Sequence, residues 1–194
     1  RRLLPNESQP TISRIFGDSR SYIIVPSEGE MKDTYQKLAE SWKESQLDQG
    51  KFARIFYDNE LDEIPSDYSV WILGKDNKYY DKAYVDSKIK AKASEQEMQS
   101  LIDATGTGSF VMVFHNENNP EKTVGYINAD SDKAIEALTR KLPHYGKYSY
   151  LGFKGDDAEN YLKGIFEVKD NPLIFSFTGE KREIEIPEHE PLTK

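Results

Sequence analysis

The chain reads Tyr22-Ile23-Ile24-Val25-Pro26 near its start, an apolar run closed by a proline. Such a run is typical of a strand that is covered on both faces of a sheet. Behind it, Ser27 and Glu30 match a capping box, which predicts that a helix begins there and ends near Gly50. Apolar residues then recur with helical spacing at Met31, Tyr35, Leu38, Ala39 and Trp42. The pattern predicts the first strand–helix unit of a parallel α/β sheet.

Working outward, apolar runs predict further strands at 52–57, 69–73, 110–114, 123–128, 148–153 and 173–177. Helices are expected at 12–16, from a second capping box at Ser94 and Glu97, from Ser131 up to a break at Pro143, and over 157–165. The stretch 78–93 has two interpretations. Its tyrosines fit a helix, whereas the alternation Lys88-Ile89-Lys90-Ala91-Lys92 fits an exposed edge strand.

These elements predict an α/β fold, a Rossmann-like or flavodoxin-like layered sheet with helices on both faces. Residues 1–18 are expected to be a leader segment with a short helix, 19–178 the α/β domain, and 179–194 an acidic, solvated tail. The two capping-box helices suggest two similar halves, 19–92 and 93–178.

The composition excludes several functions of a chain of 194 residues. Its 26 basic and 34 acidic side chains give a formal net charge of -8, which disfavours nucleic acid as the partner. Cysteine is absent, so disulfides, thiolate metal sites and thiol catalysis are excluded, although the compartment stays open. No apolar run approaches the roughly 20 residues of a membrane span. The start, Arg1-Arg2-Leu3-Leu4-Pro5, lacks a methionine and a signal peptide pattern, which favours a fragment of a longer protein over a processed product.

Motifs for catalysis and cofactor binding are equally scarce. The turn Pro26–Glu30 has a proline and two glutamates where a phosphate-binding loop needs free N–H groups and no negative charge. A receiver-type acidic site from Glu28, Glu30 and Asp76 is a weaker alternative. The histidines, His115, His144 and His189, do not have the spacing of metal ligands. A diverged acid–base enzyme using His115 or His144 remains a third hypothesis.

One segment is rich in aromatic residues: Tyr145, Tyr148, Tyr150 and Phe153 lie within nine positions. A strand with one aromatic face, Tyr148 and Tyr150 pointing the same way, is the structural interpretation. The functional alternative is a recognition surface for a carbohydrate, a peptide or a neighbouring domain.

The same segment carries a family resemblance. Lys141 to Leu151, with Gly155-Asp156-Asp157, Asn160, Lys163-Gly164 and Asn171-Pro172-Leu173, resembles the C-terminal region of bacterial zinc aminopeptidase-like proteins, gluzincins related to membrane alanyl aminopeptidase. A weaker likeness at Tyr68–Gly74 extends it over roughly residues 60–175. The motif H-E-x-x-H of that family has no counterpart here, so the resemblance carries no catalytic or zinc-binding role to any residue. Any zinc is expected only in a catalytic module absent from this chain.

The resemblance therefore implies a non-catalytic accessory domain of a bacterial metallopeptidase-like protein, whose partners are other domains of the parent. The localisation stays open, with a periplasmic or exported parent as one option. The residues expected on the interdomain or binding surface are Pro143, His144, Tyr145, Tyr148, Tyr150 and Lys163. The alternative is a freestanding module, without catalysis, that binds a small ligand or glycan at the carboxyl edge of its sheet.

Overall fold

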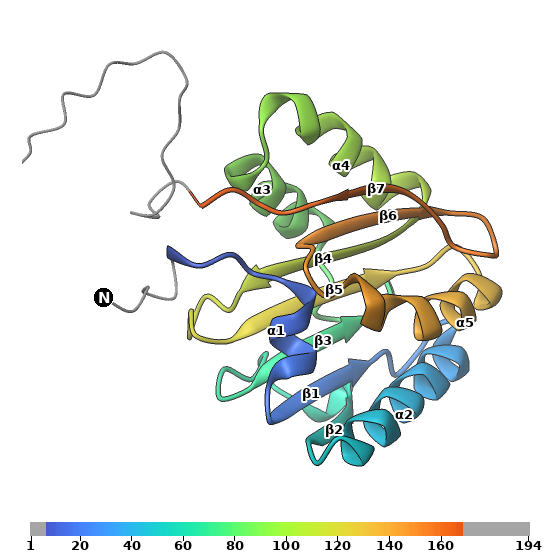
Figure 1. The fold of residues 1–194 in the computed structure, drawn as a ribbon. Coiled ribbons are helices and arrows are strands. Elements are labelled where there is room, and N and C mark those ends of the chain that lie inside the picture. The colour runs from blue at the N-terminus through green and yellow to red at the C-terminus, as the bar shows by residue number, and fades with distance from the viewer. Residues whose placement is uncertain (1–6, 169–194) are drawn as a thin grey trace, which may run out of the picture.

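The computed structural model describes residues 7–168, which form a single seven-stranded sheet with helices on both faces (Figure 1). The strand order is β2-β1-β3-β5-β4-β6-β7. The strands are β1 (Arg20–Val25), β2 (Phe52–Tyr57), β3 (Ser69–Leu73), β4 (Ser109–His115), β5 (Thr123–Asn128), β6 (Tyr150–Lys154) and β7 (Glu159–Gly164). The expected α/β layered fold is confirmed.

The sheet is parallel on one side and antiparallel on the other. Strands β2, β1, β3 and β5 run in the same direction, whereas β4 pairs antiparallel with both β5 and β6, and β6 pairs antiparallel with β7. Strands from 19–92 and from 93–178 thus join one sheet through the pair β3–β5. The antiparallel pairs all lie in the second of these stretches.

The helices divide into two layers, each over its own apolar core. They are α1 (Ile12–Gly17), α2 (Lys32–Asp48), α3 (Lys82–Lys92), α4 (Glu95–Thr107) and α5 (Asp132–Lys141), with short 3-10 turns η2 (Asp58–Glu60) and η3 (Leu142–Tyr145). Helices α1, α2 and α5 bury apolar side chains on one face, and α3 and α4 cover the other (Figure 1). Trp71 at the centre of β3 is fully buried in the first core and lies across Gly125, where a side chain would overlap its ring.

The ambiguous stretch 78–93 is a helix, so the edge-strand interpretation of its lysines is wrong. Asp81 caps α3 by accepting hydrogen bonds from the N–H groups of Ala83 and Tyr84. Val85 and Ile89, one helical turn apart, are fully buried in the second core. Burial of this apolar pair against the sheet decides the helix, in which Lys88 is half-buried and ion-paired with Glu117 and Lys90 is exposed.

The helix expected over 157–165 is also wrong, because this stretch forms strand β7. A tight turn with positive φ at Gly155 (67°) and Ala158 (46°) sends the chain back along β6. Asn160 then donates from Nδ2 to the carbonyls of Gly152 (3.0 Å) and Leu162 (2.9 Å), at an irregularity in the β6–β7 pairing. Pairing with β6 prevails over a weak local helical pattern.

Neither capping box forms as expected. Helix α2 begins at Lys32, and the Ser27 N–H donates instead to Asp58 at 2.9 Å. Ser94 does precede α4, but its hydroxyl donates to the Glu97 carboxylate at 3.0 Å and caps no backbone N–H. The Ser131 cap of α5 is confirmed, since its hydroxyl accepts from the Ala134 N–H. The strand expected at 173–177 and the acidic tail at 179–194 lie outside the described residues.

Candidate functional site

A cleft of about 370 Å³ lies at the carboxyl ends of β3 and β5, where the antiparallel strand β4 begins. We call it the carboxyl-edge cleft. Its lining residues are Met31, Lys75, Tyr80, Lys82, Thr105, Gly106, Gly108, Asn128, Ala129 and Asp130. Open α/β sheets bind ligands outside the carboxyl ends of their strands, and this volume lies within the range of small-molecule sites.

Asn128, the last residue of β5, joins the two loops that border this cleft. Its Oδ1 accepts from the Lys75 N–H at 3.1 Å, while the Gly74 N–H donates to the Ile127 carbonyl at 2.7 Å. The Asn128 side chain is nine-tenths buried, and its Nδ2 has no hydrogen-bond partner among residues 7–168. The cleft therefore has a positioned N–H donor that the described residues leave unused.

Two further buried side chains hold the loops at this edge of the sheet. The Asp58 carboxylate accepts from the N–H groups of Ser27 (2.9 Å) and Lys78 (2.7 Å), which belong to the loops after β1 and β3. Asn77 donates from Nδ2 to the carbonyls of Ile24 and Leu73. Burial alone would raise the pKa of Asp58, but these hydrogen bonds outweigh it and hold the pKa below its usual value. The edge is thus ordered around fixed polar contacts.

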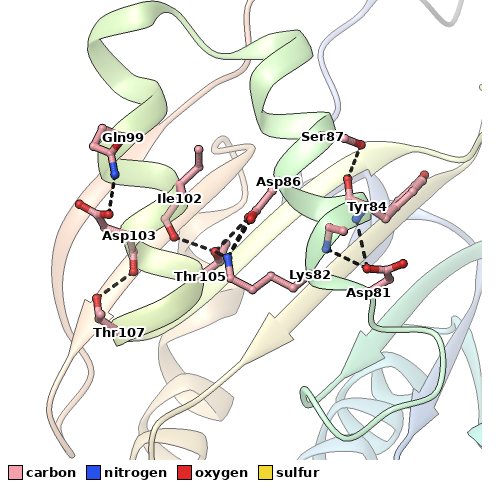
Figure 2. A network of polar contacts seen from close by, with 11 residues as sticks. Asp81, Lys82, Tyr84, Asp86, Ser87, Gln99, Ile102, Asp103, Thr105 and Thr107 are labelled. Atoms are coloured by element: carbon pink, nitrogen blue, oxygen red, sulfur yellow. Dashed lines mark hydrogen bonds and ion pairs between the residues drawn. The ribbon is translucent and has the colours of Figure 1, made fainter.

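A polar network couples α3 to α4, as Figure 2 shows, and two of its members, Lys82 and Thr105, line the cleft. Lys82 donates from Nζ to Asp86 (2.9 Å) and to the hydroxyl of Thr105 (2.8 Å). The Thr105 hydroxyl in turn contacts Asp86 at 3.2 Å and the Ile102 carbonyl at 2.7 Å. Lys82 keeps 47% of its side chain exposed, so its ammonium group is shared between this network and the solvent-filled cleft.

The charged groups facing the cleft are of both signs. Lys75 and Asp130 are exposed, and neither side chain has a hydrogen-bond or ion-pair partner within the described part of the chain. Tyr80 forms another part of the wall. Burial, together with the nearby carboxylates of Asp86 and Asp81, raises the pKa of Tyr80 to about 12. Its hydroxyl therefore stays protonated at neutral pH.

A second hollow, of about 300 Å³, lies at the amino ends of β1 and β2, between α1, α2 and η3. We call it the amino-edge pocket. It is lined by Ser13, Phe16, Gly17, Trp42, Ser45, Gln46, Gln49, Lys51, Pro143 and Gly146. The rings of Phe16 and Trp42 meet edge to face, with centroids 5.0 Å apart. The surface that lines this pocket is mostly apolar and includes one charged residue, Lys51, whereas the carboxyl-edge cleft has three charged residues.

Gln46 is the buried polar group of the amino-edge pocket, with 3% of its surface exposed. Its Oε1 accepts from the Ser21 hydroxyl at 3.0 Å, whereas its buried Nε2 finds no acceptor among residues 7–168. Leu47 and Phe52, which directly follow the pocket residues Gln46 and Lys51, are 65% and 52% exposed. Phe52 alternates along β2 with Ala53 of the first core, so its side chain points to the opposite face of the sheet from this pocket.

Of the six residues that the sequence predicted on one surface, five lie together in the structure and Tyr150 lies elsewhere. Tyr145 and Tyr148 pack against the first core with ring centroids 6.0 Å apart, and the Lys163 ammonium lies 5.9 Å from the Tyr148 ring. Pro143 and His144 are exposed on η3, and Pro143 also lines the amino-edge pocket. These five residues lie on or beside one face of the molecule.

Tyr150 does not belong to that surface, and the expectation that Tyr148 and Tyr150 point the same way is wrong. Tyr150 is 1% exposed and packs in the second core, where its ring centroid lies 5.1 Å from that of Phe166. Strand β6 begins only at Tyr150, so Tyr148 lies in the preceding turn and the alternation of a strand does not apply to it.

The histidines are separate in the structure as well. Ring Nε2 of His115 lies 2.7 Å from the Ser8 carbonyl, and its Nδ1 is buried without a partner among residues 7–168. Burial lowers the pKa of His115, and the nearby cations Arg14 and Lys92 lower it further against the effect of the Ser8 hydrogen bond. His144 is exposed on η3, and His189 lies outside the described residues. Across 7–168, no three His, Asp or Glu side chains are grouped as metal ligands.

Comparison with protein-family models and with curated proteins identifies no relative. No family model matches this chain. A search of curated proteins likewise returns no match. None of the helices in the described part is long and apolar enough to cross a membrane. The function must therefore be inferred from the geometry of the two hollows.

The sequence analysis missed the residues of the carboxyl-edge cleft. Lys75 and Asn128 are 53 positions apart, and neither belongs to a motif. A signal was nevertheless present, because both follow or end strands that were predicted at 69–73 and 123–128. The carboxyl ends of parallel strands meet at one edge of a sheet, but the pairing of β3 with β5 had to be known first.

Proposed function

We propose that this chain is a non-catalytic accessory domain that packs against a neighbouring domain of a larger protein through its amino-edge pocket. The observation that carries the proposal is the pocket between α1, α2 and η3, which is lined by the aromatic pair Phe16 and Trp42 and by Gln46 with its unpaired Nε2. Exposed apolar surface that is rimmed by polar residues marks interaction sites on soluble proteins. The resemblance noted from the sequence suggests a metallopeptidase-like parent.

The energetics favour an apolar partner side chain in this pocket. Full burial of a Leu or Phe side chain contributes about 1.5–3 kcal/mol, so the insertion of one such side chain of the partner is a substantial driving force. The aromatic pair Phe16 and Trp42 offers edges and faces against which an inserted side chain can pack. An acceptor brought by the partner would also satisfy the Nε2 of Gln46, whose burial without a hydrogen bond is costly.

The aromatic segment contributes to the same side of the molecule. Pro143 lines the pocket, and the exposed His144 follows it in η3. Tyr145 and Tyr148 continue the surface beyond this turn. A partner seated over the pocket would therefore contact most of the residues that the sequence singled out, with Tyr150 as the exception.

Association in the complete protein tests the proposal. The double variant Ser45→Lys, Gln49→Lys should keep the thermal stability of the isolated chain, because both lining residues are exposed, and should weaken binding to the rest of the parent protein supplied as a separate chain. Ser41→Lys is the matched control, since Ser41 is an exposed residue of the same helix outside the pocket. Titration calorimetry measures the affinity. Equal affinity of the double variant and the native chain contradicts the proposal, as does a loss confined to Ser41→Lys.

The absence of catalysis needs its own test. The isolated chain should contain no stoichiometric zinc and should turn over no aminopeptidase substrate. Metal analysis after purification and a fluorogenic aminoacyl-amide assay measure both. Stoichiometric zinc together with turnover would overturn the assignment of this chain as a non-catalytic domain.

A second candidate function is a module that binds a small ligand or a glycan. The carboxyl-edge cleft favours it, because Lys75, Asn128 and Asp130 present polar groups there that no described residue engages. The two functions are compatible, since the cleft and the amino-edge pocket lie at opposite ends of the parallel strands.

A further inference from the structure

We infer that the carboxyl-edge cleft binds a small zwitterion of the amino-acid type, with its carboxylate at Lys75 and Asn128 and its ammonium group at Asp130. The inference rests on the second candidate function above and names the ligand class for that site. It is independent of docking through the amino-edge pocket.

The carboxylate end of the ligand is assigned by two donors. Lys75 supplies an ammonium group without an ion-pair partner among residues 7–168, and Asn128 supplies its unused Nδ2. Both come from the ends of adjacent strands, and the bond from the Lys75 N–H to Asn128 Oδ1 fixes the amide so that Nδ2 is the free end. A cation and an unused amide donor together suit a carboxylate, which accepts from both.

The ammonium end is assigned by the charge balance. Of the lysines in the cleft, Lys82 is neutralised by Asp86, with which it forms an ion pair at 2.9 Å. Lys75 and Asp130 then remain as one positive and one negative charge, so the cleft has no net charge. A phosphate dianion would be repelled by Asp130, whereas a zwitterion matches each remaining charge with its opposite.

The rest of the lining leaves room for the remainder of such a molecule. Met31, Ala129 and the Tyr80 ring are apolar surfaces, and Gly106 and Gly108 bring no side chain into the cleft. A volume of about 370 Å³ corresponds to roughly a dozen water molecules, enough for a free amino acid but not for an oligosaccharide.

The test compares three matched compounds. The native chain is screened by thermal unfolding against the free amino acids and a panel of sugars, and each amino-acid hit is repeated with the acid that lacks the amino group and the amine that lacks the carboxylate. A hundredfold excess of ligand over Kd should raise the midpoint by roughly 5–10 °C. The two truncated compounds should each bind about tenfold or more weakly, since each leaves one charge of the cleft unpaired.

Variants then locate the site. Lys75→Gln and Asp130→Asn should each weaken binding about tenfold, because each removes one charge-assisted bond. Asn128→Asp keeps the acceptor for the Lys75 N–H but replaces the Nδ2 donor by a negative charge, so it should abolish carboxylate binding. The matched controls Lys43→Gln and Glu44→Gln, both exposed on α2 and outside the cleft, should bind within twofold of the native chain.

The outcomes separate the inference from the function on which it rests. Loss of affinity in the three cleft variants, with retention in both controls, supports the zwitterion site. Stabilisation by sugars but by no amino acid overturns the ligand class and keeps a ligand-binding module. A screen of amino acids and sugars without any hit overturns both, and binding unchanged in Lys75→Gln and Asp130→Asn overturns the location.

Discussion

The hydroxyl of Tyr150 donates a hydrogen bond to the carboxylate of Glu97, which joins β6 to the first turn of α4. Gly164 of β7 makes room for this contact, because a methyl group there would overlap the Tyr150 hydroxyl. Burial and the neighbouring Glu97 raise the pKa of Tyr150, so the phenol remains the donor. The antiparallel side of the sheet is thereby tied to the helical layer that covers it.

Tyr150→Phe should lower the free energy of unfolding by about 1–2 kcal/mol, because it removes a hydrogen bond to a charged acceptor and leaves the ring in the core. The midpoint of thermal unfolding should fall by roughly 2–8 °C for a chain of this size. Tyr161→Phe, at an exposed tyrosine of β7, serves as the control. Equal midpoints for Tyr150→Phe and the native chain would show that the contact is not formed in solution.

Gly164→Ala should destabilise the protein by about 1–3 kcal/mol, since the added methyl group forces Tyr150 away from Glu97. The cost should shrink in the background of Tyr150→Leu, whose shorter side chain does not reach over Gly164. A double-mutant cycle from denaturant unfolding measures this coupling. Additive effects of the two substitutions would rule out the close approach of Tyr150 to Gly164.

The free energy of unfolding should fall as the pH is lowered from 7 to 5, because of His115. Its pKa is depressed in the folded protein, so the unfolded chain binds a proton near pH 6.5 before the folded chain does. The contribution of the neutral His115 ring to the free energy of unfolding is therefore fully present above about pH 6.5. It is lost as the pH falls through the lower pKa of the folded protein. One proton accounts for a slope of at most about 1.4 kcal/mol per pH unit.

His115→Gln should flatten this pH dependence, whereas His144→Gln, at an exposed histidine, should leave it intact. Urea unfolding at half-unit pH steps measures both variants beside the native chain. A slope that persists in His115→Gln would assign the titration to another group.

Asp58→Asn should lower the free energy of unfolding at pH 7 by about 1–3 kcal/mol, because the charged acceptor of two backbone N–H groups is lost. The pKa of Asp58 is depressed on folding, so its contribution is present above about pH 4 and disappears as the pH falls through the folded pKa. The difference in the free energy of unfolding between the native chain and Asp58→Asn should therefore become smaller as the pH is lowered below about 4. Asp62→Asn, at an exposed aspartate nearby, should show no such difference at either pH.

The strands that the sequence predicted best are the parallel ones. The ranges 52–57, 69–73 and 123–128 agree with β2, β3 and β5. Each is a short apolar run between breakers, and buried parallel strands are recognised by such local composition. Helix α2 was predicted from its apolar stripe, but it begins at Lys32 and not directly after Ser27. The Ser27 N–H is bonded instead to the Asp58 carboxylate from another loop.

The errors lie where a distant partner chooses between two local patterns. Residues 82–92 form a helix because Val85 and Ile89 find the second core, and residues 159–164 form a strand because β6 offers an open edge. Tyr148 and Tyr150 lie on opposite sides of the sheet because the turn before β6 breaks their alternation. In each case the deciding contact is non-local.

By itself, the sequence determined the α/β class, the first strand–helix unit and the buried parallel strands, because apolar runs and helical periodicity are local properties of a chain. The tertiary structure decided which residues meet. Lys75 and Asn128 reach one cleft only because β3 pairs with β5, and Phe16, Trp42 and Pro143 reach one pocket only because α1, α2 and η3 pack on the same face. Strand order and layer packing arise from long-range burial, which leaves no motif in the sequence around these residues.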